Sequence, residues 1–233
     1  MFARYAVLSA LSAFLLASPV SAEQLYWGVQ AEQLEWRSGE GSKTLAWDAD
    51  AFVGTDELKA VWRSEAEYAT GPDNFETLEN QLRLQVPVST FFDAVAGVRH
   101  DSPDEGPRRT YGVLGLHGLA KQWFELDADL FLSEYPSARF EVEYEGLITN
   151  RIIFTPSIEL DLPLADDEAT LRAAFSPKLE IGGRLSYDLI DRAISPYVGI
   201  HWERTFGESG RLVKAEGEDN NAVSLVVGLK LMF

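Results

Sequence analysis

Residues 221–233 read NAVSLVVGLKLMF, and this stretch decides the fold. Every second side chain is large and apolar: Val223, Leu225, Val227, Leu229, Leu231 and Phe233. The residues between them are small, mixed or charged, so one face of a β-strand is apolar and the other is not. A strand with an apolar outer face, at the end of a chain of similar strands, is typical of a transmembrane β-barrel. The apolar face contacts lipid and the polar face lines the lumen.

The same alternation recurs along the chain and predicts about twelve strands. Residues 124–130, for example, alternate Phe and Leu or Ala with Glu and Asp. The predicted strands are Leu25–Arg37, Thr44–Gly54, Glu57–Ala69, Glu76–Pro87, Thr90–Asp101, Thr110–Leu119, Gln122–Ser133, Ala138–Thr149, Arg151–Asp161, Lys178–Ile190, Ser195–Gly207 and Asn221–Phe233. We therefore predict an all-β fold, a transmembrane antiparallel up-and-down β-barrel of about twelve strands.

The predicted connections alternate between long and short. Polar segments such as Leu162–Pro177 and Glu208–Asn220 are long, whereas turns such as Thr55-Asp56 and Ala120-Lys121 are tight. Outer-membrane barrels combine short periplasmic turns with longer outside loops and keep both termini on the periplasmic side. A soluble all-β domain has no need of such regular alternation. We expect aromatic residues to mark the two rims. They are Trp27, Phe92, Phe124, Tyr187 and Phe233 at the periplasmic rim and Trp47, Tyr68 and Phe140 at the outer rim.

The N-terminus has the pattern of an export signal. Arg4 precedes an apolar stretch, and small residues at Val20 and Ala22 suit cleavage after Ala22. We predict a signal peptide over residues 1–22 and an outer-membrane barrel over residues 23–233. The absence of cysteine excludes disulfides, thiolate metal sites and cysteine catalysis.

The formal net charge of −17 argues against a nucleic-acid partner, which would require a basic face. Much of this charge falls on the predicted inward faces, where acidic residues outnumber basic ones. Two outcomes are open. The charges pair into a network that fills the lumen, or they line a hydrated acidic path that favours cations.

The histidines suggest metal ligands within the lumen, because imidazole commonly binds copper and zinc. His117 and His201 are predicted to face inward, whereas His100 lies near the outer rim. Hairpin pairing places His117 across from Trp123 or Glu125, and His201 across from approximately Arg184. The predicted metal ligands are His117, His201, Glu125 and Glu203. The two histidines lie on well-separated strands, so one ion is not expected to bind both.

Several local patterns are more specific than the alternation. They are LAWDAD at 45–50, AGVRHD at 96–101, GLAKQWFE at 118–125, TNR at 149–151 and SPYVGIHWER at 195–204. In this order they resemble the copper resistance protein B family of Gram-negative outer membranes. The resemblance covers nearly the whole predicted mature chain.

This resemblance implies an outer-membrane barrel of copper resistance and homeostasis that binds or passes copper ions. It implies contact with outer-membrane lipid, metal cations and a periplasmic copper protein. Many members carry a Met- and His-rich segment before the barrel. Here the first strand is expected to begin almost directly after the predicted cleavage site, and Met232 is the only methionine beyond that site.

Two other functions remain open from the sequence. A general cation-preferring pore, or a structural barrel without a copper-specific site, would share the acidic lumen. A barrel enzyme such as a lipase would need a nucleophile, a base and an orienting group at the barrel surface. No Ser-His pair has suitable spacing for this, so we predict that the protein is not an enzyme.

Overall fold

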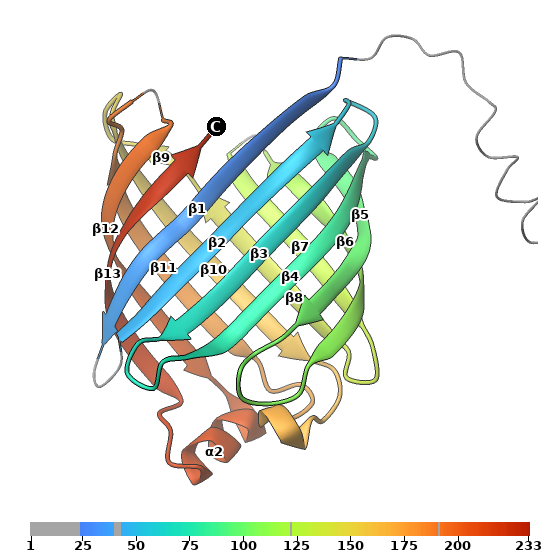
Figure 1. The fold of residues 1–233 in the computed structure, drawn as a ribbon, viewed down its shortest axis with the longest axis vertical. Helices are drawn as coiled ribbons and strands as arrows, with labels where there is room; N and C mark the ends of the chain where they lie inside the picture. Colours follow the sequence, from blue (N-terminus) through green and yellow to red (C-terminus); the bar gives the residue numbers. More distant parts are fainter. Residues whose placement is uncertain (1–23, 40–42, 122, 191) are drawn as a thin grey trace, which may run out of the picture.

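The computed structural model describes residues 24–39, 43–121, 123–190 and 192–233, which form a closed antiparallel β-barrel (Figure 1). The predicted signal peptide lies outside the described residues. The strands are β1 (Tyr26–Gly39), β2 (Lys43–Gly54), β3 (Lys59–Ala69), β4 (Asn74–Pro87), β5 (Phe92–Asp101), β6 (Arg109–Ala120), β7 (Phe124–Leu132), β8 (Ser137–Tyr144), β9 (Gly146–Leu147), β10 (Ile152–Pro163), β11 (Lys178–Tyr187), β12 (Ile194–Thr205) and β13 (Asn221–Met232).

Each strand pairs with its neighbours in the chain, and β1 pairs with β13 to close the barrel. The short strands β8 and β9 both pair with β10, so they form one span that is interrupted at Glu145. The barrel therefore has twelve spans, as predicted. Each predicted strand is present, and its ends differ from the prediction by a few residues at most.

The connections fall into two classes, one at each end of the barrel. The chain enters β1 at the same end as its C-terminus, and the turns at this end are short (Figure 1). We call it the turn end. The opposite, loop end carries the 3₁₀ helix η2 (Glu168–Thr170) and the helix α2 (Gly207–Ala215). None of the helices in the described part of the chain is long and apolar enough to cross a bilayer.

Helix α2 corrects the prediction that Glu208–Asn220 is only a polar loop. Gly207 has a positive φ of 64°, which lets the chain turn sharply after β12. The backbone N–H of Glu208 then donates to the hydroxyl of Ser176 (3.0 Å), and the hydroxyl of Ser209 accepts from the N–H of Ala173 (2.7 Å). Contacts with the β10–β11 connection thus hold the first turn of the helix, and sequence periodicity does not reveal them.

The two faces of the barrel wall differ as predicted. On β13 the side chains of Leu225 and Val227 are 66% and 62% exposed, whereas Val226 between them is 2% exposed. Most of the predicted rim aromatics are also exposed on the outer surface, among them Trp27 and Phe233. The outer surface is therefore apolar, while the lumen holds the charged side chains.

One feature of β1 lies outside the predicted alternation. A β-bulge interrupts its pairing with β2 between Ala31 and Gln33, so Glu32 is an additional residue in the strand. Glu32 and Glu35 both line the interior, although they are an odd number of positions apart along the chain. Bulges re-aim side chains in this way and are common near functional sites.

Candidate functional site

Three arginines cross the lumen from one wall to another. Arg63 of β3 and Arg83 of β4 lie 3.4 Å and 2.6 Å from the carboxylates of Asp127 and Asp129 on β7. Arg139 of β8 pairs with carboxylates on three other strands: Glu65 (2.8 Å), Glu79 (3.0 Å) and Glu159 (3.2 Å). Because β3 and β8 are nearly opposite in the ring, these ion pairs span the interior. We call Arg63, Arg83, Asp127, Asp129 and Arg139 the waist.

The interior contains two cavities that meet close to the waist. The cavity towards the loop end has a volume of about 860 Å³, and the cavity towards the turn end about 200 Å³. Asp48 and Glu141 line both. We call them the loop-side and the turn-side cavity.

The pairing of the charges differs between parts of the lumen. The waist is a network of paired charges. In contrast, several carboxylates of the turn-side cavity have no ion pair with Lys, Arg or His among the described residues: Glu32, Asp48, Glu125, Glu141 and Glu143. This part of the lumen has the negative character expected of a path that attracts cations.

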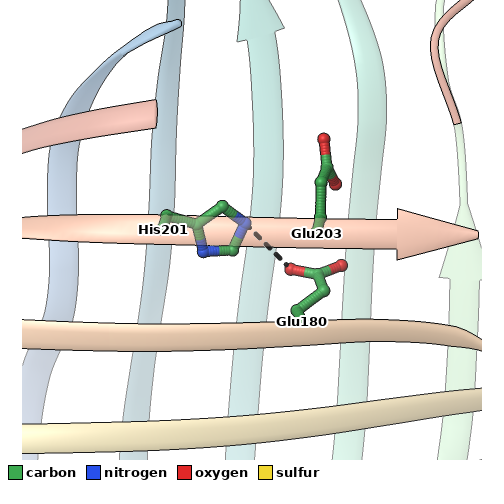
Figure 2. Close-up of side chains that lie close together, drawn as sticks. All are labelled: Glu180, His201 and Glu203. Carbon is green, nitrogen blue, oxygen red and sulfur yellow. Dashed lines mark ion pairs between the residues drawn. The ribbon is translucent and has the colours of Figure 1, made fainter. Parts of the chain in front are cut away.

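One imidazole and two carboxylates lie close together on the barrel wall, towards the loop end. Glu180 of β11 and Glu203 of β12 are directly opposite in register, and His201 precedes Glu203 by two residues on the same inward face. One ligand atom from each residue lies within 4.8 Å of the others. The Nε2 atom of His201 is 3.3 Å from Glu180 (Figure 2). We call these three residues the His201 group.

Two cationic side chains border the His201 group. The ammonium of Lys178 lies 2.9 Å from Glu180 and 2.6 Å from Glu203. The guanidinium of Arg37 is 3.5 Å from His201 Nε2 and also pairs with Glu67 at 2.5 Å. The carboxylates are therefore already neutralised in part by the protein's own charges.

A second histidine lies in the turn-side cavity. His117 Nδ1 is 3.2 Å from the Asp127 carboxylate, directly opposite in register. Glu125 lines the same cavity. The hydrogen bond to Asp127 fixes the orientation of the imidazole, as carboxylates commonly do for metal-binding histidines.

The four ligands predicted from the sequence separate into two groups. His201 lies with Glu203, while His117 shares a cavity with Glu125. The two histidines line different cavities, in agreement with the expectation that they do not share an ion.

The pairing partners predicted for the histidines were wrong, by two or four residues for His117 and by two for His201. His117 pairs with Asp127, since the turn after β6 extends to Trp123, and His201 pairs with Gly182 rather than Arg184. Glu180 and Asp127 were consequently missed as neighbours of the histidines. Only the true lengths of the two turns would have identified them.

Comparisons with known proteins agree with this architecture. The family model described as Copper resistance protein B precursor (CopB) matches residues 25–233. Copper resistance protein B of Escherichia coli is 33% identical over 201 residues, which are 85% of this chain and 67% of that protein. The Copper resistance protein B homolog of Pseudomonas syringae pv. tomato (strain ATCC BAA-871 / DC3000) is similar to the same extent.

Among solved structures, the NanC porin has a similar fold. Its TM-score is 0.55 at 12% sequence identity, and the match covers 88% of this chain and 99% of the porin. At this identity the likeness concerns the fold alone.

Proposed function

The chain belongs to the copper resistance protein B family, and from this premise we propose that it binds copper ions transiently within its lumen at the outer membrane. The observation that carries the proposal is the His201 group, whose three ligand atoms lie within 4.8 Å of one another. An imidazole and two carboxylates are nitrogen and oxygen donors, which suit Cu(II) better than Cu(I). The ion is cargo of the barrel and not a resident cofactor.

The turn-side cavity provides a second proposed contact for the ion. His117, Glu125 and Asp127 line this cavity, and none of them belongs to the His201 group. The histidines of the two groups line different cavities, which meet close to the waist. We propose that the two groups hold copper at successive positions along the lumen.

A copper titration tests the main proposal. Isothermal calorimetry of the detergent-folded barrel should detect Cu(II) binding that zinc reproduces only weakly, since Cu(II) binds such donors more tightly. Replacing His201 by Ala together with Glu203 by Gln should weaken binding about tenfold or more, because two of three donors are lost.

The matched control is His100→Ala, which removes an exposed histidine near the loop end that lies outside the lumen groups. This variant should bind copper like the wild type. Unchanged affinity in the His201→Ala, Glu203→Gln variant would exclude the His201 group. The corresponding test of the turn-side contact is His117→Ala.

A second candidate is a general cation-preferring pore. It is favoured by the turn-side carboxylates that have no ion pair among the described residues, since a ring of negative charge attracts cations of every kind. Planar-bilayer recording distinguishes the two functions. A large cation conductance that copper does not change would favour the general pore, whereas block by micromolar copper would favour a specific site.

The remaining parts of the proposal concern the setting of the barrel. We propose that residues 1–22 are removed as a signal peptide, which mass spectrometry of the exported protein would test by a chain that begins at Glu23. The outward apolar faces contact outer-membrane lipid, and a periplasmic copper protein exchanges ions with the turn end. We propose no enzymatic activity, and hydrolysis of a lipid ester by the pure protein would contradict this.

A further inference from the structure

We propose that the ammonium of Lys178 competes with metal ions for the two carboxylates of the His201 group. A divalent cation binds these carboxylates by displacing the ammonium. This inference rests on the proposed function and concerns the regulation of the same site. Its consequence is that copper is held weakly and released readily, as passage requires.

The ammonium lies between the two carboxylates of the His201 group and contacts the oxygen of Glu180 that does not face His201. Lys178 Nζ bridges one oxygen of Glu180 (2.9 Å) and one of Glu203 (2.6 Å). These are the same two carboxylates that supply ligand atoms to the His201 group. A cation that binds both carboxylates therefore competes with Lys178 for the same two residues.

The position of Lys178 allows this exchange. It is the first residue of β11, directly after the β10–β11 connection, and its side chain is 37% exposed. It also lines the loop-side cavity of about 860 Å³. The flexible stem of a lysine can swing the ammonium into this space and back to water. The second border cation, Arg37, is held differently, because it is bonded to Glu35 and Glu67 and only 12% exposed.

The charges explain why the competition weakens binding. Two carboxylates and one ammonium leave the group with one net negative charge. A divalent ion and an ammonium only a few ångströms apart repel each other strongly in such a partly buried site. Displacement of the Lys178 ammonium relieves this repulsion, but it also breaks the two ion pairs of Lys178. Because the ammonium can form these ion pairs again, it lowers the affinity of the site for the metal ion.

The test compares copper affinity in three forms of the full-length, detergent-folded protein. Lys178→Met keeps the length of the side chain and removes its charge. It should bind Cu(II) about tenfold or more tightly than the wild type, because the metal no longer displaces an ammonium. Lys178→Arg retains a cation and should remain weak. The matched control is Lys214→Met on α2, an exposed lysine that is not part of the group, which should leave the affinity unchanged.

A second measurement uses the wild-type protein and does not depend on how the variants fold. An amine-reactive reagent followed by mass spectrometry should label Lys178 faster in the presence of Cu(II), while labelling of Lys214 stays constant. Equal labelling of Lys178 with and without bound copper would overturn the inference.

The outcomes separate this inference from the proposed function. If Lys178→Met binds copper no more tightly than the wild type, while His201→Ala abolishes binding, the His201 group binds copper and Lys178 does not compete with it. If neither the wild type nor Lys178→Met binds copper, both proposals fail. Tighter binding by Lys178→Met that is lost again on adding His201→Ala would support both.

Discussion

Glu35 shows how a charge is kept inside the barrel wall. Its carboxylate is 1% exposed and accepts hydrogen bonds from Arg184 (2.9 and 3.0 Å), Arg37 (2.7 Å) and the Tyr197 hydroxyl (2.8 Å). Arg184 and Tyr197 lie on β11 and β12, while Glu35 lies on β1. The carboxylate therefore ties both sides of the β1–β13 closure together.

We expect Glu35→Ala to destabilise the barrel by about 3–5 kcal/mol, because removal of one partner leaves buried cations uncompensated. Urea unfolding of the protein in detergent or lipid vesicles would measure the change. The control is Glu57→Ala in the exposed β2–β3 turn, which should be close to neutral. Equal stability of both variants would mean that Arg37 and Arg184 are solvated in the native barrel.

For single residues, the sequence predicts which side chains face the lumen. It predicts less well which of these side chains contact one another. His117 and His201 were assigned to the inward face, although their partners were displaced by two or four residues. A displacement by an even number keeps the face, since side chains alternate with period two along a strand. The exact neighbours depend on turn length, and cross-lumen pairs such as Arg139 with Glu65 depend on how the whole ring closes.

Strand β13 illustrates how the lipid-facing surface constrains an element. Val227 lies near the middle of this strand, is 62% exposed and pairs with Val198 and Trp36 on the neighbouring strands. An arginine here would place a charge in the hydrocarbon region. Val227→Arg should cost about 2–4 kcal/mol, while Val227→Leu should be tolerated.

The two variants are folded into lipid vesicles, and the folded fraction of each is measured from the gel mobility of the unheated protein. If Val227→Arg folds as completely and as stably as Val227→Leu, the outer face of β13 does not contact lipid.

The strands could be predicted from the sequence because a strand in lipid must place apolar residues on one face along its whole length. The bulge at Glu32 could not, since residues 30–33 (QAEQ) hold no large apolar side chain that would reveal the additional residue. Nor could helix α2, whose first turn depends on Ser176 and on the buried Ser209, which contacts Ala173. These features arise from contacts between distant segments and not from local periodicity.

In the whole barrel, the ion-paired waist lies between two cavities that are lined by charged side chains. The waist separates a large loop-side cavity from a small acidic turn-side cavity, and its arginines are largely buried; Arg83 is 1% exposed. The His201 group lies on the loop side, while His117 lies on the turn side. Ions that pass between the two cavities therefore pass the ion-paired side chains of the waist, which occupy the lumen there.

This arrangement predicts a wild-type barrel of low conductance. A charge-balanced change, Arg83→Gln with Asp129→Asn, removes one ion pair of 2.6 Å without adding net charge to the lumen. Because amides are smaller than a guanidinium and carry no charge, the variant should conduct cations several times better than the wild type. Single-channel recording in planar bilayers measures this, with Arg211→Gln on the exposed surface of α2 as the control.

A potassium chloride gradient would also report the sign of the permeant ion. With the waist opened, the turn-side carboxylates should dominate, and the reversal potential should shift towards that of potassium. High wild-type conductance, or anion preference in the opened variant, would show that the waist is not the barrier. Cation preference that appears only after the waist is opened would mean that the ion-paired side chains of the waist keep ordinary cations from crossing the native barrel.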